Sequence, residues 1–236
     1  MDLNVRIKCS ECPIRYRAVC SRCDDHELSL LEQIKVYRTF EPDQPILWRG
    51  EDLKFVGSVV SGVATLGKSM EDGRTQMVGL LLPSDFIGRP GRPVIEFDVT
   101  AITEVTLCCF ERKPFEEMIE KTPHLAQRLM EISLDELDAA RDWMLLLGRK
   151  TAREKIATFL QMLVVRQSVE SVTGVKPELA LPLTREEISD YLGLTLETVS
   201  RQISALKNEG VVAFSDRTHF EVLDREALLV ATGDDL

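Results

Sequence analysis

The sequence has no long apolar run. None of its hydrophobic stretches reaches the roughly 18 residues that a membrane-spanning helix needs. Its beginning, MDLNVRIKCSEC, also lacks the apolar core of a secretion signal. We therefore expect a cytoplasmic protein without a membrane partner.

Positive charge is scarce as well. The chain has 29 Lys and Arg residues against 39 Asp and Glu residues, which gives a net charge of −10 at pH 7. Because the neutralisation of phosphates drives sequence-independent binding to nucleic acid, this balance argues against a protein that coats DNA or RNA. Any contact with DNA must be confined to a local, oriented surface.

Histidine is rare, and no nucleophile motif is present. The three histidines, His26, His124 and His219, lie in no pattern that would pair them with a nucleophile. The sequence therefore predicts a protein that is not an enzyme. Its hydrophobic content of 44% is nevertheless sufficient for the cores of two ordinary domains.

Residues 25–111 consist of short stretches rich in Val, Ile, Leu, Phe and Thr. Gly, Pro, Asp and Ser separate these stretches, for example at Gly62 and at Asp72-Gly73. This punctuation is typical of an antiparallel β sandwich or barrel, and residues 105–110 are expected to form its last strand.

From Pro114 to Leu147 the pattern becomes helical, with Pro123 as an interruption near the start. Apolar and small residues recur there at alternating spacings of three and four, the heptad pattern by which two copies of one helix pack together. The stripe could also pack on the protein's own barrel, and spacing does not decide between these possibilities, although the helix length favours a dimer. The stripe, here called the seam, consists of Met130, Ser133, Leu137, Ala140, Met144 and Leu147.

Two short helices around a glycine turn are expected at residues 184–208, after another helical run at residues 151–165. Thr184 with Glu187 makes a capping box for the first short helix, Gly193 provides the turn, and Thr195 with Thr198 opens the second. This is the helix-turn-helix arrangement, in which the second helix enters the major groove of DNA.

The second of these helices carries a polar face suited to reading bases. Glu197, Ser200 and Arg201 lie at i, i+3 and i+4, and Thr195 and Thr198 precede them at the helix start. Glu can accept a hydrogen bond from cytosine N4, and Arg can donate two to guanine. The alternative is a solvated face with an incidental Glu–Arg ion pair.

Lys207, further along the same helix, is expected to contact phosphate and to fix the register without reading sequence.

The segment YLGLTLETVSR, Tyr191 to Arg201, resembles the recognition signature of the Crp/Fnr family of transcription regulators. The similarity extends over nearly the whole chain, including residues 59–62, 84–88 and 151–157. It implies a homodimer that binds double-stranded DNA and contacts RNA polymerase, with the loop at residues 70–74 as the expected polymerase-facing surface.

The same resemblance implies an α+β fold made of four parts. They are a cysteine-rich N-terminal segment (1–24), a cyclic-nucleotide-binding-like β-roll or jelly roll (25–113), a long dimerisation helix (114–148) and a C-terminal winged helix-turn-helix domain (149–236).

Six cysteines fall in two groups. Because the cytosol is reducing, this clustering favours metal ligation over disulfides. Thiolates suit either a 4Fe-4S cluster or tetrahedral zinc, and zinc would use the four N-terminal cysteines. The groups are Cys9, Cys12, Cys20 and Cys23, and the adjacent pair Cys108 and Cys109.

The spacing Cys9-x2-Cys12-x7-Cys20 resembles that of the oxygen-sensing Fnr branch, which holds a 4Fe-4S cluster through three N-terminal thiolates and a fourth from the roll. By this resemblance Cys108 is the fourth ligand. Cys23 and Cys109 are then spare thiols, since neighbours on a strand point to opposite faces.

The Fnr resemblance further implies an oxygen-responsive activator that reads a palindrome with half-sites like TTGAT. Related regulators carry an acidic residue in the dimer helix where Ala140 stands here. A zinc-stabilised scaffold or adaptor, and a heme or nitric-oxide sensor of the same fold, remain alternatives.

Cyclic nucleotide is not an expected ligand. Crp-type members hold its phosphate with an Arg-Ser pair, and the corresponding positions here are Ile95 and Glu96. A carboxylate at that point would repel the anion, although Arg89 and Arg92 lie nearby in sequence.

Overall fold

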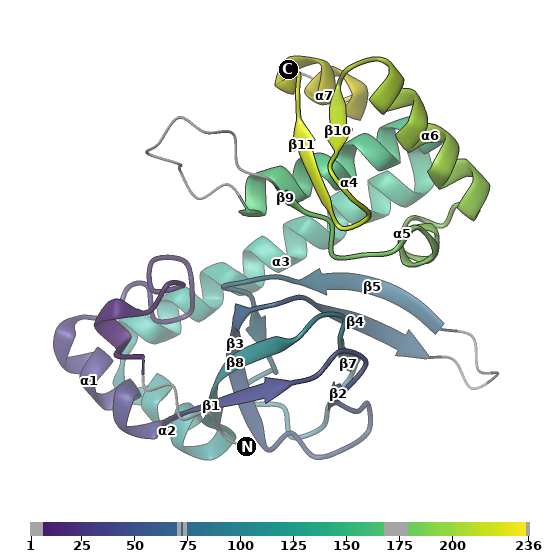
Figure 1. The fold of residues 1–236 in the computed structure, drawn as a ribbon. Coiled ribbons are helices and arrows are strands. Elements are labelled where there is room, and N and C mark those ends of the chain that lie inside the picture. The colour runs from purple at the N-terminus through teal and green to yellow at the C-terminus, as the bar shows by residue number, and fades with distance from the viewer. Residues whose placement is uncertain (1–6, 70–71, 73–74, 168–178, 235–236) are drawn as a thin grey trace. The chain divides into compact units, whose positions relative to one another are not determined.

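The computed structural model describes residues 7–69, 72, 75–167 and 179–234 (Figure 1). The chain divides into two compact units, Met1–Asp138 and Ala139–Leu236, and the helix α3 (Pro123–Arg149) crosses the boundary between them. None of the described helices combines the length and the apolarity that crossing a membrane requires.

Antiparallel strands build most of the first unit. One sheet has the order β1-β8-β3-β6 and the other the order β2-β7-β4-β5. Buried side chains of both sheets, among them Val59, Ala64, Val99 and Leu107, belong to one core. This arrangement confirms the expected β-roll. The strands are β1 (Lys35–Phe40), β2 (Pro45–Leu47), β3 (Phe55–Ser61), β4 (Ala64–Ser69), β5 (Thr75–Leu81), β6 (Phe86–Ile87), β7 (Asp98–Ala101) and β8 (Val105–Glu111).

A glycine lets strand β3 approach β8 closely. Gly57 lies opposite Cys109, and a Cβ atom at residue 57 would be 2.6 Å from the carbonyl oxygen of Cys108. Real side chains do not tolerate that distance, so a larger residue at this position would push β8 away. The position of the strand that carries Cys108 and Cys109 therefore depends on residue 57 having no side chain.

The structure corrects the prediction for residues 25–34, which were expected to belong to the β region. Asp25–Ile34 form the helix α1. Asp24 and Glu27 make a reciprocal capping box at its start, and Leu28 and Leu31, three residues apart, turn into the core. The β-structure begins only at Lys35.

The expected single helix from Pro114 to Leu147 is two helices, α2 (Arg112–Lys121) and α3. The chain leaves the helical conformation at Thr122, and Pro123 is the first residue of α3, where a missing backbone N–H does no harm. Phe115 and Leu125 are fully buried and join the core of the roll, so both helices are anchored to it.

The second unit is a winged helix-turn-helix, as predicted. Its described strands form one sheet in the order β10-β11-β9. Fully buried side chains of three helices, Leu160, Leu192 and Val199, lie in its interior, and Trp143 near the end of α3 stacks on Tyr191 with ring centroids 4.1 Å apart. The elements are α4 (Ala152–Gln167), β9 (Leu179–Ala180), α5 (Arg185–Leu192), α6 (Leu196–Asn208), β10 (Val212–Phe214), β11 (His219–Val222) and α7 (Arg225–Thr232).

Candidate cysteine site and DNA-reading helix

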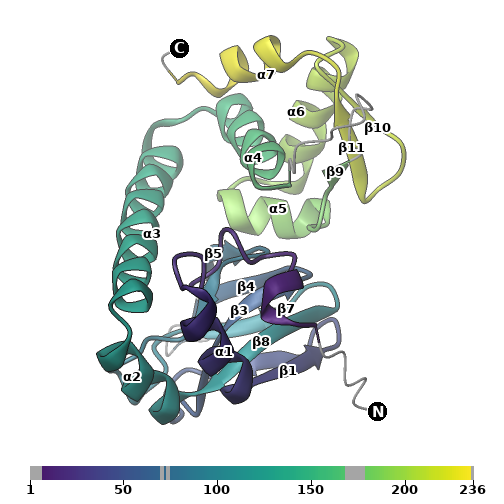
Figure 2. The same ribbon diagram turned by 90° about the vertical axis from the view of Figure 1, so that its left-hand side faces the viewer.

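Thiols of the N-terminal segment and of the β-roll come together at one place. Cys9 lies in the short helix η1 (Cys9–Glu11), and residues 9–23 are here called the cysteine loop. Cys12, Cys20 and Cys108 of strand β8 all pack against one small apolar cluster. Figure 2 shows the cysteine loop lying over the sheet that contains β1, β8 and β3. The cluster consists of Ile14, Ala18 and Val60, with Tyr37 of β1 beside it.

The electrostatic surroundings of these thiols indicate the same grouping. Burial raises the pKa of Cys20 to about 11, and the next largest contribution comes from Cys12. The pKa of Cys108 is also raised, first by burial and then by Cys20, Cys12 and Cys9. Burial likewise raises the pKa of Cys9, against a hydrogen bond from Lys35 that lowers it. Cys9, Cys12, Cys20 and Cys108 are here called the four-thiol site.

The two remaining cysteines belong to the main core of the roll, as Cys9 does, and Cys20 and Cys108 also pack against that core. Cys109 is buried in the main core of the roll, and burial raises its pKa to about 12 against the charge of Arg38. It does not join the apolar cluster that Cys108 contacts, in keeping with the opposite directions of neighbouring strand residues. Cys23 is buried in the main core as well, and its pKa is raised to about 12, first by burial and then by Cys20.

The distances between the cysteine sulfurs can be compared with those that a zinc site or a four-iron cluster requires. Tetrahedral zinc with bonds of about 2.3 Å needs sulfur–sulfur distances of about 3.8 Å. Among the described residues no three cysteine sulfurs lie within 4.8 Å of one another, and the trio found at that spacing is Asp24, Glu27 and His124. A four-iron cluster binds each thiolate through a different iron and needs wider spacing. No three sulfurs of the four-thiol site therefore stand at the spacing of a tetrahedral zinc site.

Two basic residues that sequence reasoning missed organise this site. Arg15 donates from Nη1 to the carbonyl oxygens of Cys20 and Ser21 and from Nη2 to that of Cys23, each at 3.0 Å, which folds the cysteine loop back on itself. Lys35 donates from Nζ to Cys9 Sγ at 3.3 Å and to the carbonyl oxygen of Ile7. The only sequence signal for these roles is the presence of basic residues near the cysteines. Basic residues are too common for this signal to identify Arg15 and Lys35.

The seam of α3 is exposed in the single chain. The exposed fractions are 60% for Met130, 46% for Leu137, 66% for Met144 and 37% for Leu147. Ser133 and Ala140 are exposed too, and Leu134, an apolar residue that the heptad count omitted, is 54% exposed. An apolar stripe of this length on a helix surface is typical of a helix that pairs with another.

The helix α6 presents the expected polar face. Thr195 caps it by accepting from the backbone N–H of Thr198 at 3.3 Å, and Gly193 ends α5 in the left-handed conformation with a φ of 62°. The pKa of Glu197 is lowered by its own backbone N–H and then by the Thr195 hydroxyl. The other cap, Thr184 with Glu187, is also present as predicted.

Burial divides α6 into two sides. Val199, Ile203 and Leu206 are buried, and the candidate DNA-contacting residues of the opposite side are exposed except for the half-buried Thr198. Ser204, which the sequence analysis did not select, is exposed and follows Ser200 by four residues, so helical periodicity could have identified it. The exposed candidates are Thr195, Glu197, Ser200, Arg201 and Lys207.

The hairpin after α6 adds an exposed cation. Arg217 lies between β10 and β11, in a loop that Asp216 stabilises by accepting from the backbone N–H of Thr218 at 2.6 Å and by pairing with His219. These contacts, the Thr218 N–H first, lower the pKa of Asp216 to about 2.

Two further places in the first unit were singled out by the family resemblance, the positions of the phosphate-binding pair and the loop at residues 70–74. Ile95 is buried and Glu96 is exposed, so the first of these positions has no open side chain to offer a ligand. The expected polymerase-facing loop, residues 70–74, lies outside the described residues except for Asp72.

Each of the two units resembles a known protein family. The model of the Crp-like helix-turn-helix domain matches residues 154–230, and that of the cyclic nucleotide-binding domain matches residues 37–122. The chain is 60% identical over 230 residues, 97% of this chain and 93% of the relative, to the transcriptional activator protein FnrL of Cereibacter sphaeroides. It is 40% identical to the nitrogen fixation regulation protein FixK of Bradyrhizobium diazoefficiens, with 87% of this chain and 86% of the relative covered.

Solved structures give the same result. FixK2 from Bradyrhizobium japonicum matches with a TM-score of 0.75 and 34% identity, covering 86% of this chain and all of that one. A CooA variant from Carboxydothermus hydrogenoformans, at 19% identity and a TM-score of 0.68, shares the fold. The chain therefore belongs to the Crp/Fnr family, as a transcriptional activator of the Fnr/FixK type that binds DNA through a helix-turn-helix and is not an enzyme.

Proposed function

We propose that this activator works as a homodimer and responds to oxygen through a 4Fe-4S cluster held by the four-thiol site. The observation that carries the proposal is the packing of Cys12, Cys20 and Cys108 against one apolar cluster. The likeness to the transcriptional activator protein FnrL, at 60% identity, supports the role as an activator.

The residues around the four-thiol site have distinct tasks in this proposal. Arg15 holds the cysteine loop in a ligating shape through three backbone carbonyls. Lys35 places a positive charge at Cys9 Sγ, which offsets the negative charge that thiolates bring. Tyr37 and the apolar cluster limit the access of water. When bound, the cluster would supply the sensitivity to oxygen.

In this proposal the cysteine loop is fixed on the roll when the four-thiol site holds its cluster, and pairing of two α3 helices along the seam is then favoured. Pairing sets two copies of α6 one DNA turn apart, the spacing at which a two-fold symmetric site is read. When the four-thiol site has lost its cluster, the cysteine loop is free and the pairing of the two α3 helices is weaker. The dimer would activate transcription in contact with RNA polymerase.

For the DNA itself we propose a palindrome with half-sites like TTGAT. Arg201 can donate two hydrogen bonds to the guanine, Glu197 can accept from a cytosine N4, and Ser200 can meet a thymine edge. All three side chains are exposed on one side of α6. Cyclic nucleotide has no role in this proposal, because the position expected for its phosphate ligand holds Glu96.

Purification without oxygen tests the proposal. The expected product is a brown protein with four iron and four sulfide per four-thiol site, which is bleached by air. One zinc per chain without iron would instead support the zinc-stabilised scaffold, and a heme spectrum would support the heme sensor. Dimer formation, measured by sedimentation, and specific DNA binding should both fall when air is admitted.

A further inference from the structure

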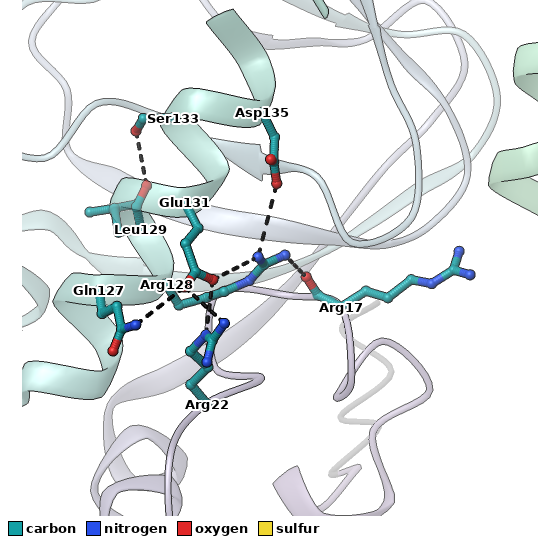
Figure 3. Close-up of polar contacts among 8 residues, drawn as sticks. All are labelled: Arg17, Arg22, Gln127, Arg128, Leu129, Glu131, Ser133 and Asp135. Carbon is teal, nitrogen blue, oxygen red and sulfur yellow. Dashed lines mark hydrogen bonds and ion pairs between the residues drawn. The ribbon is translucent and has the colours of Figure 1, made fainter. Parts of the chain in front are cut away.

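The cysteine loop is fastened to helix α3 by a compact set of ionic contacts (Figure 3). Arg22 donates from Nε to Glu131 Oε2 at 2.9 Å, and its Nη2 lies 2.8 Å from Oε1 of the same carboxylate. Arg128 donates from Nη2 to the backbone carbonyl oxygen of Arg17 at 2.9 Å and from Nη1 to Glu131 Oε2 at 3.2 Å. Arg22, Arg128, Glu131 and the Arg17 carbonyl are here called the loop–helix clamp.

The clamp has a bidentate geometry. A guanidinium that meets both oxygens of a carboxylate fixes direction as well as distance, because two parallel bonds resist rotation. The bond from Arg128 to the Arg17 carbonyl adds a second attachment on the loop side. Arg128 is further held by Asp135, whose Oδ2 lies 4.0 Å from Nη1. The pKa of Glu131 is lowered, with the hydrogen bond from Arg22 as the main cause, so the carboxylate is charged at neutral pH.

The two ends of the clamp lie beside the four-thiol site and beside the first residue of the seam. On the loop side, Arg17 and Arg22 stand three residues before and two residues after Cys20, a member of the four-thiol site. On the helix side, Glu131 follows Met130, the first residue of the seam. The ion pair between Arg22 and Glu131 and the hydrogen bond from Arg128 to the Arg17 carbonyl thus connect residues next to Cys20 with the helix that carries the seam.

We infer that the loop–helix clamp is the device that transmits the state of the four-thiol site to α3. The inference rests on the proposed function. While Cys20 is ligated, the cysteine loop has one conformation, and Arg22 and the Arg17 carbonyl can hold Glu131 and Arg128 so that the seam is set for pairing. When Cys20 is released, the loop side of the clamp has no fixed position and the constraint on α3 is lost. Arg22, Arg128 and Glu131 are thus positioning residues that never touch the metal group.

A thermodynamic cycle on the full chain tests this. The dimer dissociation constant of the native chain and of Arg22→Gln is measured by anaerobic sedimentation, first with the metal group bound and then after its removal by air and a chelator. With the group bound, the variant should dimerise about five-fold more weakly at unchanged iron and sulfide content and unchanged visible spectrum. After removal, the native chain and the variant should dimerise equally. A purely structural bond would weaken both forms alike, and that result would overturn the inference.

Matched variants make the test specific. Arg17→Gln removes an equal charge from the same loop but keeps the backbone carbonyl that Arg128 uses, and the Arg17 guanidinium extends away from the clamp in Figure 3; this variant should behave like the native chain. Arg22→Glu and Glu131→Arg should each weaken the bound dimer, and the double exchange should restore part of it, whereas an additive loss would contradict the inference. If the native chain itself binds no metal group, the proposed function fails first, and that failure is visible before any variant is compared.

Discussion

The DNA-reading helix and the four-thiol site differ in where their supports lie along the chain. α6 is positioned by residues close to it in sequence: Thr195 caps it, Gly193 sets the turn before it, and its buried side packs within the same unit. The four-thiol site instead joins Cys9, Cys12 and Cys20 to Cys108, which lies on the far strand β8.

This difference has a consequence for how each region can respond. A helix held by local caps and a continuous buried face keeps its shape whatever is bound elsewhere. A site assembled from a loop and a distant strand depends on whatever bridges the two. The architecture therefore separates a DNA-reading helix with local supports from a cysteine site whose parts are far apart in the chain, and the following variants test that separation.

The largest effect is expected for Cys108→Ala. Removal of the roll's thiol should abolish binding of the metal group and anaerobic DNA binding, because the cysteine loop then has no ligand on β8. Cys109→Ala is the matched control and should keep both, since Cys109 lies in the main core and not in the apolar cluster of the site. Iron and sulfide per chain measure the outcome. A full complement in Cys108→Ala would remove this residue from the ligand set.

The next effect concerns pairing. Leu137→Glu should produce monomers, because each copy would place an unpaired charge in the seam, at a cost of several kcal/mol. Ala139→Glu puts the same charge on an exposed residue of α3 outside the seam and should leave the dimer intact. Anaerobic sedimentation distinguishes the two variants. An unchanged dimer in Leu137→Glu would mean that α3 does not form the interface.

The same contrast explains what could be predicted from the sequence. The caps and the turn of the helix-turn-helix were correctly predicted because Thr184, Gly193 and Thr195 act on neighbours within four residues. The identical type of signal is present at Asp24 and Glu27, and the β prediction for residues 25–34 was wrong because it did not use that signal.

Contacts between distant segments left no such signal. The pairing of Arg22 with Glu131 joins residues from opposite ends of the first unit, and nothing near either one indicates its partner. The same is true of Lys35 with Cys9. Only the fold brings these residues together, whereas the grouping of Cys108 with the N-terminal cysteines came from a family resemblance and not from spacing.

On the reading side, Arg201→Ala should reduce affinity by roughly 1–3 kcal/mol per half-site and relax the preference for G·C at one position. The metal content and the dimer should not change, because Arg201 is exposed on α6 and belongs neither to the four-thiol site nor to the seam. Competition binding with half-sites substituted at each position gives the answer. Equal weakening at every sequence would identify Arg201 as a phosphate contact.

The smallest effect is expected for Lys207→Ala. Lys207 is exposed near the end of α6, six residues beyond Arg201, and should meet the DNA backbone, which carries no sequence information. The variant should bind all sites more weakly by a similar factor, and its plot of log affinity against log salt should be flatter by about one unit per contact, since one fewer counterion is released. Ser204→Ala changes the exposed face between the two residues without removing a charge, so its salt dependence should match that of the native chain. A loss of base preference in Lys207→Ala, at an unchanged salt slope, would move the reading face towards the end of α6.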